Sequence, residues 1–351
     1  MAIEWLAGNR LRGTTAERPN FGLPSGSVGG WVELGRTTLG GAADSISVSS
    51  LSDKRYYMFL LDKPTTGDSS FRCRLNSDSG TNYARRYSIN GGTDTTATSQ
   101  DSMYFSANQS HDEFSVGYLA NLSAKEKLVL GHTVAEGGAG AANDPERSEF
   151  TAKWTNTSSA VDEITAVNLG SGSYNTGSEL VVLGWDPADS HTTNFWEELA
   201  SVELSSAGDN LSTGTFTAKK YLWVQVFLKA SGSINTDFTF NNDTGSNYSE
   251  RWSINGGADG TATSSTKLDM LSSTSYNEFA NMFIINNSSN EKLVITHQIG
   301  EEGSGAGIAS RRQELVGKWS NTSSQITEID FTNAVTGDFD SGSIVKVWGA
   351  D

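Results

Sequence analysis

Apolar residues alternate with polar ones along most of the chain. Apolar pairs two positions apart include Ile46 with Val48, Cys73 with Leu75, and Leu180 with Val182. Successive side chains of a β-strand point to opposite faces, so this period predicts strands with one buried face. The runs 56–61 and 221–227 are almost continuously apolar and predict central strands that are covered on both faces. No window favours a helix of three turns.

Clusters of Gly, Asn, Asp and Ser separate the predicted strands. The clearest are the glycine-rich segments 136–140 and 301–307, in a chain that has 37 Gly and only 5 Pro. Many short strands with turn signals between them are typical of an antiparallel sandwich. The sequence therefore predicts an all-β protein built from antiparallel β-sandwiches, with a jelly-roll-like topology preferred over an immunoglobulin-like one.

The chain repeats itself at a constant shift of 165 residues. Arg86-Tyr-Ser-Ile-Asn-Gly-Gly92 matches Arg251-Trp-Ser-Ile-Asn-Gly-Gly257, and 16 of the 24 positions in 76–99 are identical in 241–264. No insertion or deletion separates the copies. A fixed register of this length indicates duplication of a whole domain.

The shift sets the expected domain boundaries. An N-terminal arm occupies 1–30, the first sandwich 31–186 and the second 187–351. The arm contains prolines and several glycines and is expected to be extended. A short junction near 186–190 leaves the sandwiches little freedom, and a pseudo-two-fold relation between them is one possible arrangement.

Charge and composition exclude several classes of function. The formal net charge is −16, and the segment 1–21 carries Arg10, Arg12 and Arg18 against two Glu, so the remainder is acidic. An acidic body without a basic, aromatic-rich stretch argues against nucleic-acid binding. No apolar run approaches the length of a membrane span, and no export signal is visible, so we expect no membrane partner. A single cysteine, Cys73, excludes a disulfide framework.

The densest shared chemistry lies in 76–94 and its equivalent 241–259. Asp78 and Asp243 are candidate Ca²⁺ ligands, although the loop lacks the closing Glu of an EF-hand. The other candidates could present a stacking and hydrogen-bonding surface to a sugar: Tyr83, Arg86 and Asp94, with Tyr248, Arg251 and Asp259 in the second copy. A structural interpretation is favoured, in which these residues form two tight turns and the arginines pair with nearby carboxylates.

Catalytic patterns are weak. His132 and His297 are repeat equivalents, expected at a strand end and bonded to a loop, and no histidines have zinc-site spacing. No Gly-x-Ser-x-Gly turn is present, whereas a pair of carboxylates for glycoside cleavage cannot be judged from spacing. The sequence predicts no catalytic residue, no cofactor other than a possible Ca²⁺, and a protein that is not an enzyme.

The order of features in each repeat resembles virion structural proteins of tailed viruses. It consists of a strand run, the Asn-x-Asp-x-Gly-x-Asn-Tyr loop, a glycine-rich loop, a Lys-Trp strand (153–154 and 318–319) and a closing strand at 341–349. The resemblance implies jelly-roll-like modules in tail, fibre or capsid-decorating components. It also implies a chain that assembles into virions in the host cytoplasm without an export signal.

Two functions from different classes follow as expectations. The first is a virion structural protein that binds other virion proteins and itself, with Trp5, Leu6, Arg10 and Arg12 of the arm as assembly candidates. The second is a carbohydrate-binding, lectin-like tandem module that contacts a surface glycan, a role that would suit a host-attachment appendage.

Overall fold

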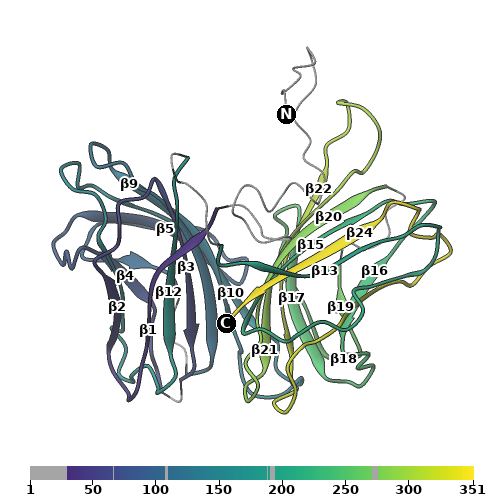
Figure 1. Cartoon of the computed structure of the whole chain (residues 1–351), viewed down its shortest axis with the longest axis horizontal. Coiled ribbons are helices and arrows are strands. Elements are labelled where there is room, and N and C mark those ends of the chain that lie inside the picture. The colour runs from purple at the N-terminus through teal and green to yellow at the C-terminus, as the bar shows by residue number, and fades with distance from the viewer. Residues whose placement is uncertain (1–29, 66, 107–109, 188, 190–193, 271–275) are drawn as a thin grey trace, which may run out of the picture.

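The computed structural model describes residues 30–351, except 66, 107–109, 188, 190–193 and 271–275. The arm candidates Trp5, Leu6, Arg10 and Arg12 lie outside the described residues. Two lobes lie side by side, one from each repeat, and the C-terminus lies between them (Figure 1). Within the described residues, no helix is long and apolar enough to cross a membrane.

The described chain is all-β, as the alternation predicts, with 24 strands in four antiparallel sheets. The first repeat contains β1 (Val32–Thr38), β2 (Ser45–Ser49), β3 (Tyr56–Lys63), β4 (Arg72–Leu75), β5 (Tyr83–Ile89), β6 (Thr95–Gln100), β7 (Met103–Tyr104), β8 (Glu113–Ala120), β9 (Lys127–Ala135), β10 (Glu146–Trp154), β11 (Glu163–Val167) and β12 (Glu179–Trp185). The second contains β13 (Glu197–Glu203), β14 (Asn210–Ser212), β15 (Tyr221–Leu228), β16 (Thr236–Phe240), β17 (Tyr248–Ile254), β18 (Gly260–Ser265), β19 (Leu268–Asp269), β20 (Glu278–Ile285), β21 (Lys292–Gly300), β22 (Arg311–Trp319), β23 (Ile329–Asn333) and β24 (Ile344–Ala350).

Each repeat is a sandwich of one large and one small sheet. In the first repeat the eight-stranded sheet has the order β1-β12-β3-β8-β9-β10-β5-β6, and the four-stranded sheet has the order β2-β11-β4-β7. The second repeat has the same orders, β13-β24-β15-β20-β21-β22-β17-β18 and β14-β23-β16-β19. The two strand orders correspond one to one, which follows from the gapless duplication.

A hydrophobic core fills each sandwich between its two sheets. Phe59, Phe150 and Trp154 contribute to the core of the first repeat, and Phe240 and Trp319 to that of the second. Strand β3 is buried at every position after Tyr56, which confirms the predicted coverage of both faces for 57–61, whereas in the run 221–227 Phe227 is exposed. Its inner face packs into the core, and its outer face is covered by the second repeat.

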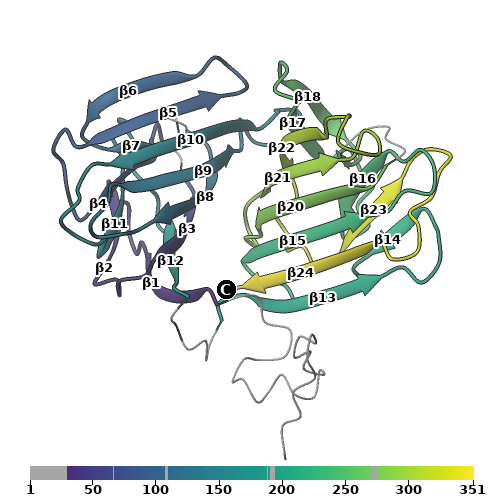
Figure 2. The same cartoon turned by 90° about the horizontal axis from the view of Figure 1, so that it is seen from above.

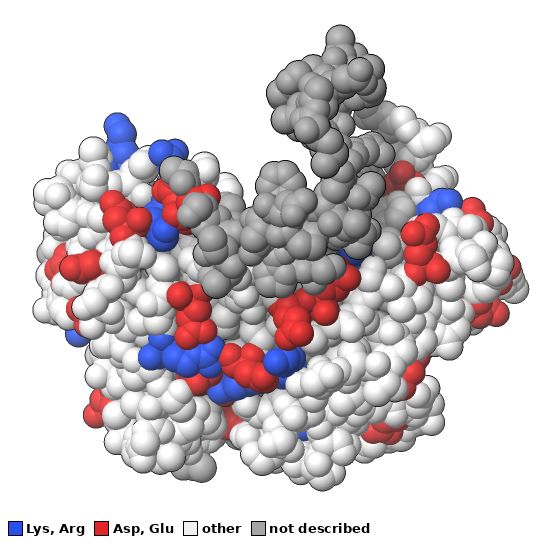
Figure 3. Space-filling model, viewed as in Figure 1, with Lys and Arg blue, Asp and Glu red and all other residues white. Residues whose placement is uncertain are grey.

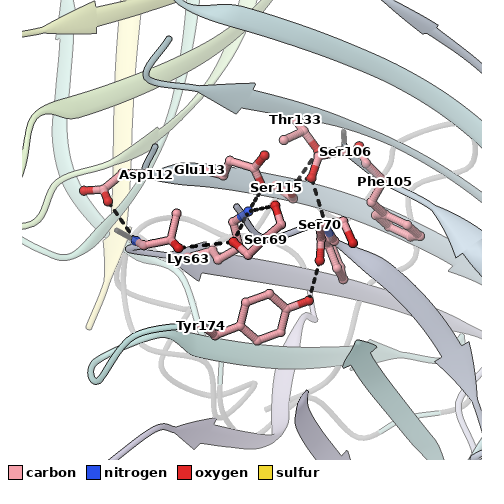
Figure 4. A network of polar contacts seen from close by, with 12 residues as sticks. Lys63, Ser69, Ser70, Phe105, Ser106, Asp112, Glu113, Ser115, Thr133 and Tyr174 are labelled. Atoms are coloured by element: carbon pink, nitrogen blue, oxygen red, sulfur yellow. Dashed lines mark hydrogen bonds and ion pairs between the residues drawn. The ribbon is translucent and has the colours of Figure 1, made fainter. Parts of the chain in front are cut away.

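The first core also contains a buried polar network (Figure 4). The Lys63 ammonium lies 2.6 Å from the Glu113 carboxylate, and both side chains have no exposed area. Lys63 also donates to the backbone carbonyl and the hydroxyl of Ser69, at 3.1 Å each, and Ser106 donates to Glu113 at 2.9 Å. Burial raises the pKa of Glu113 above its usual value, although Lys63 acts in the opposite direction.

Candidate binding face of the first repeat

The outer faces of the two large sheets meet each other (Figure 2). From the first repeat comes the covering surface, which we define as Met58, Leu60, Phe114, Val116 and Val134. From the second repeat comes the covered surface, which we define as Trp196, Tyr221, Phe283, Ile285, Leu293, Ile295 and Val316. These residues form one buried hydrophobic cluster that is separate from the two sandwich cores. The repeats are therefore joined by a third core.

A glycine-rich loop of the first repeat, residues 136–145, lies on the second repeat, and we name it the docking loop. Lys318 donates to the backbone carbonyls of Glu136, at 3.0 Å, and Gly138. The Gly140 amide donates to Glu291 at 2.6 Å. At the other end of the loop, the Arg251 guanidinium donates to the carbonyl of Pro145 at 2.9 Å.

Buried ion pairs fix this contact. Arg147 donates two hydrogen bonds to Asp259, at 3.0 and 2.8 Å, and its guanidinium lies 3.1 Å from Glu314. The Arg147 side chain is 7% exposed and that of Asp259 is 4% exposed. Elsewhere on the seam Lys220 lies 3.0 Å from Asp62 and 3.1 Å from Glu179. Figure 3 shows acidic and basic side chains gathered where the two lobes meet.

The contact between the repeats does not have two-fold symmetry. A two-fold axis would pair Arg312, the equivalent of Arg147, with Asp94, the equivalent of Asp259. Instead Arg312 lies 3.7 Å from Glu314 of its own repeat, with a side chain that is 59% exposed. The repeats meet through different surfaces, one covering and one covered, so the contact is heterologous. The possible pseudo-two-fold arrangement is thus wrong.

The first repeat has an open counterpart of the covered surface, and we name it the open groove. Its volume is about 870 Å³, and it is lined by Trp31, Tyr56, Arg86, Thr96, Thr98, Tyr118, Leu128, Leu130, Thr151, Lys153 and Trp185, among others. Leu128 is 58% exposed and Leu130 is 50% exposed, whereas their equivalents Leu293 and Ile295 are each 2% exposed. Exposed large apolar side chains grouped in a groove mark a binding surface.

The open groove has aromatic and aliphatic side chains over β12, β3, β8 and β9, and its polar side chains lie over β10, β5 and β6. The rings of Tyr56 and Trp185 stack with centroids 5.4 Å apart and an interplanar angle of 24°. Arg86 pairs with Asp94 at 3.3 Å, and Lys153 pairs with Glu126 at 2.8 Å, in both cases with exposed side chains. Such a groove can bury an apolar protein surface or stack against a sugar ring.

The predicted tyrosines lie inside the sandwiches. Tyr83 is 1% exposed and Tyr248 is fully buried. The Tyr83 hydroxyl donates to the Asp78 carbonyl at 3.0 Å and accepts from the Leu75 amide at 3.0 Å, and the second copy repeats this arrangement. Rings in this position cannot stack on a sugar from solvent, so the structure replaces the sugar-binding hypothesis for both tyrosines by a role in the fold.

The predicted charged residues differ between the copies. Arg86 and Asp94 pair with each other at the side of the open groove. Arg251 and Asp259 are instead enclosed at the contact between the repeats, where Arg251 pairs with Asp144 and Asp259 with Arg147. The prediction that both arginines pair with carboxylates is confirmed. Of the six ligand candidates, only Arg86 and Asp94 remain accessible.

The calcium candidates Asp78 and Asp243 stabilise turns through hydrogen bonds to their carboxylates. The Asp78 carboxylate accepts hydrogen bonds from Trp154 Nε1 at 2.7 Å, the Gly80 amide at 2.8 Å and Asn82 at 2.9 Å, and Asp243 is held in the same way. Desolvation raises the pKa of Asp78, but these hydrogen bonds outweigh it and hold the pKa below its usual value. In the described part of the chain, no group of three His, Cys, Asp or Glu side chains could hold a metal ion.

The second predicted turn is also present. Asn90 and Gly91 have φ values of 50° and 67°, and the Gly92 amide donates to the Ile89 carbonyl at 2.9 Å. These left-handed values are those of a type I′ hairpin turn, which Asn-Gly favours. The structural interpretation of 76–94 is therefore confirmed.

The histidines do not end strands, contrary to expectation. His132 lies within β9 and His297 within β21, and their rings meet across the contact between the repeats with centroids 4.1 Å apart. Burial lowers the pKa of both rings, and Arg147 acts in the same direction on each, whereas Glu314 acts in the opposite direction on His297. Two uncharged rings can pack together at this distance, whereas two imidazolium ions would repel each other.

The apolar residues of the open groove escaped the sequence analysis, which named only Arg86 as a binding candidate among the residues that line it. Leu128 and Leu130 alternate with the core residue Val129, so both faces of β9 are apolar. Apolar residues on the outer face of a strand whose inner face already packs into the core were the signal in the sequence for a binding surface.

The chain matches no protein-family model and no curated protein. Among solved structures, domains LG4-5 of the mouse laminin alpha1 chain align over 92% of this chain and 90% of their own length, with 9% identity and a TM-score of 0.20. The attachment invasion locus protein Ail of Yersinia pestis aligns over 76% of this chain and 98% of its own, with 5% identity and a TM-score of 0.14. Scores this low carry no argument about function.

Proposed function

We propose that the chain is a non-enzymatic structural protein of a virion, a capsid-decorating or tail and fibre component, that acts by protein–protein assembly. One observation carries the assembly role. The open groove is equivalent to a surface that protein covers in the second repeat, and its leucines are exposed. A surface of this composition is suited to burial against another protein. The resemblance of the repeat to virion proteins of tailed viruses supplies the setting.

Immunogold electron microscopy of purified particles of the virus that encodes this chain tests the virion role. We expect gold at regular positions on the capsid or tail. Particles of a virus from which the gene is deleted provide the background. Label at background level on intact particles would contradict the proposal.

A second candidate function is carbohydrate binding, favoured by the stacked rings of Tyr56 and Trp185 at the open groove. Sugars bind to proteins by stacking on aromatic rings while Arg and Thr side chains donate hydrogen bonds to their hydroxyls. A glycan array compares the native chain with Trp185→Ala. Binding that the substitution abolishes would support this function, and no binding on a broad array would count against it.

A further inference from the structure

We propose that the open groove receives the second repeat of another copy of this chain, so that copies associate head to tail. The inference rests on the proposed assembly role and names the partner of that same groove. The proposed contact has the same arrangement as the contact inside the chain, where the first repeat covers the second. In the proposed contact the second repeat of one copy covers the first repeat of the next.

Some charged groups of the internal contact are retained on both surfaces of the proposed one, whereas Asp62, Asp144 and Glu179 are replaced by Phe227, Ala309 and Ile344. On the groove side, Asp94 and Lys153 stand at the positions of Asp259 and Lys318. On the other side, Arg312 stands at the position of Arg147. The retained groups are accessible, because the side chains of Asp94, Lys153 and Arg312 are 53%, 44% and 59% exposed. The Arg147–Asp259 ion pair of the internal contact thus has its counterpart in Arg312 and Asp94.

The loop that would enter the groove is free. Residues 301–310, which we name the free loop, are equivalent to the docking loop, and all of them except Gly303 are exposed. In the docking loop, by contrast, Gly138, Ala141 and Pro145 are buried. The Gly305 amide stands where the Gly140 amide donates to Glu291, and Glu126 is the matching acceptor in the groove.

At one hydrogen-bonded pair of the internal contact, the residues on both sides differ between the repeats. Inside the chain, Asn287 donates to Asp62 at 3.0 Å, and the equivalent positions carry Leu122 and Phe227. Both equivalents are apolar, and they are 47% and 37% exposed. This polar pair thus becomes an apolar pair in the proposed contact, whereas Arg55, at the position of Lys220, loses the carboxylate that Asp62 supplies inside the chain.

At a second position, a serine that bonds to a backbone carbonyl inside the chain is replaced by alanine. The Ser249 hydroxyl donates to the Asn143 carbonyl at 2.8 Å, and Ala84 and Ile308 occupy the equivalent positions. Ile308 is 51% exposed on the free loop, and Ala84 lines the open groove. The second repeat also exposes Phe279 and Ile299, the equivalents of Phe114 and Val134 of the covering surface. These exposed apolar groups make no contribution to either sandwich core.

One large sheet can cover one neighbour and be covered by another at once. Strand β8 carries Phe114 and Val116 at its covering end and Tyr118 at its groove end. Strand β9 likewise carries Val134 at one end and Leu128 at the other. A heterologous contact of this kind forms a ring if its rotation closes and a filament if it does not.

The test uses two full-length variants that remove opposite surfaces. Leu128→Asp places a charge in the groove, and Arg312→Asp places like charge against Asp94. Leu169→Asp is the matched control, because Leu169 is 52% exposed and lies outside the residues that line the groove. Sedimentation velocity over a range of concentrations measures association, and circular dichroism confirms that each variant is folded.

We expect the native chain and the control to associate as concentration rises, and each of the other variants to bind its own kind roughly 10- to 100-fold more weakly. A mixture of Leu128→Asp and Arg312→Asp should form a 1:1 complex that grows no further, because each supplies the surface that the other lacks. A native chain that stays monomeric, or a mixture that forms no such complex, would overturn the proposal. Association through the groove only after removal of residues 1–29 would also overturn it, by showing that the arm fills the groove.

Failure of this contact and failure of the virion role give different results. A monomeric native chain with gold-labelled particles removes only the head-to-tail contact. Self-association through the groove with unlabelled particles removes only the virion setting.

Discussion

Arg147 of the first repeat and Asp259 of the second form a bidentate ion pair, with both side chains almost fully enclosed between the sandwiches. Removing one member of such a pair leaves the other charge buried without compensation. The ion pair therefore contributes to the stability of the contact between the two repeats, in addition to the complementary shapes of their surfaces.

The substitution Arg147→Met should lower the free energy of unfolding by about 3 kcal/mol, because Asp259 keeps its charge without its closest partner. Urea unfolding followed by tryptophan fluorescence measures the change. The duplication supplies a matched control, Arg312→Met, which removes an exposed side chain and should change stability by less than about 0.5 kcal/mol. Equal effects of the two substitutions would show that the internal ion pair adds nothing.

Removing one member of the buried pair of Lys63 and Glu113 should also destabilise the protein, and a second substitution at its partner should restore part of the stability. Lys63→Leu should destabilise the protein by about 3–5 kcal/mol, because an unpaired carboxylate remains in the core. The second repeat carries Leu228 at this position. Adding Glu113→Gln to the first substitution should recover part of the loss, as measured by urea unfolding of the single and double variants. A double variant less stable than Lys63→Leu alone would argue against an uncompensated charge as the cause.

Acidification should weaken the contact between the repeats through His132 and His297. The folded state lowers the pKa of both rings, whereas an unfolded histidine titrates near its ordinary value of about 6.5. The unfolded chain therefore binds more protons below that pH, and this part of the stability is present above about pH 6.5 and lost below it. Arg147 faces both rings, and Glu314 favours the charged form of His297.

The measurement is the difference in unfolding free energy between the native chain and His132→Gln/His297→Gln at several pH values. The difference should grow in favour of the variant as the pH falls from 7.5 to 5, by roughly 1 kcal/mol or more. The difference is measured because Glu136, which is present in both proteins, changes stability with pH in the opposite direction. Its burial, beside the negative charges of Glu291 and Asp112, raises its pKa to about 7, so its contribution to stability falls as the pH rises from about 4.5 toward 7. A difference independent of pH would exclude the histidines as the cause.

Asp78 should stabilise the fold without calcium. Asp78→Ala removes the acceptor of the Trp154 indole and should cost about 1–3 kcal/mol, with a similar loss for Asp243→Ala in the second repeat. Thermal unfolding with EDTA and with added CaCl₂ should give the same midpoint for the native chain. A midpoint that rises with calcium, and no longer rises in the Asp78→Ala variant, would restore the calcium hypothesis.

Local patterns predicted the fold because they depend on neighbours in the sequence. Alternation at Ile46 and Val48 gives a strand, and Asn90-Gly91 gives a hairpin turn, whatever lies elsewhere in the chain. Because the two copies carry the same local patterns in the same order, the 165-residue shift also predicted two copies of one architecture. Equal sequence in two copies, however, led to the expectation of equal roles.

The candidate site depended on contacts between distant segments. Arg86 and Arg251 are equivalent in sequence, yet one lies at the side of an open groove and the other is enclosed by the docking loop. No local pattern distinguishes them. For Tyr83 the sequence favoured a structural role and left sugar binding open. A tyrosine beside a turn can face solvent or close the end of a core, and the packing of Trp154 against it decides.

The covalent link between the repeats changes the entropy of any assembly built on this contact. Within one chain the covering and covered surfaces are held together at a high local concentration, so their contact needs no encounter in solution. In a head-to-tail series every second contact would be of this kind. Subunits would lose translational and rotational freedom at only half of the junctions between sandwiches, and a moderate affinity at the open groove would suffice to hold a long series together.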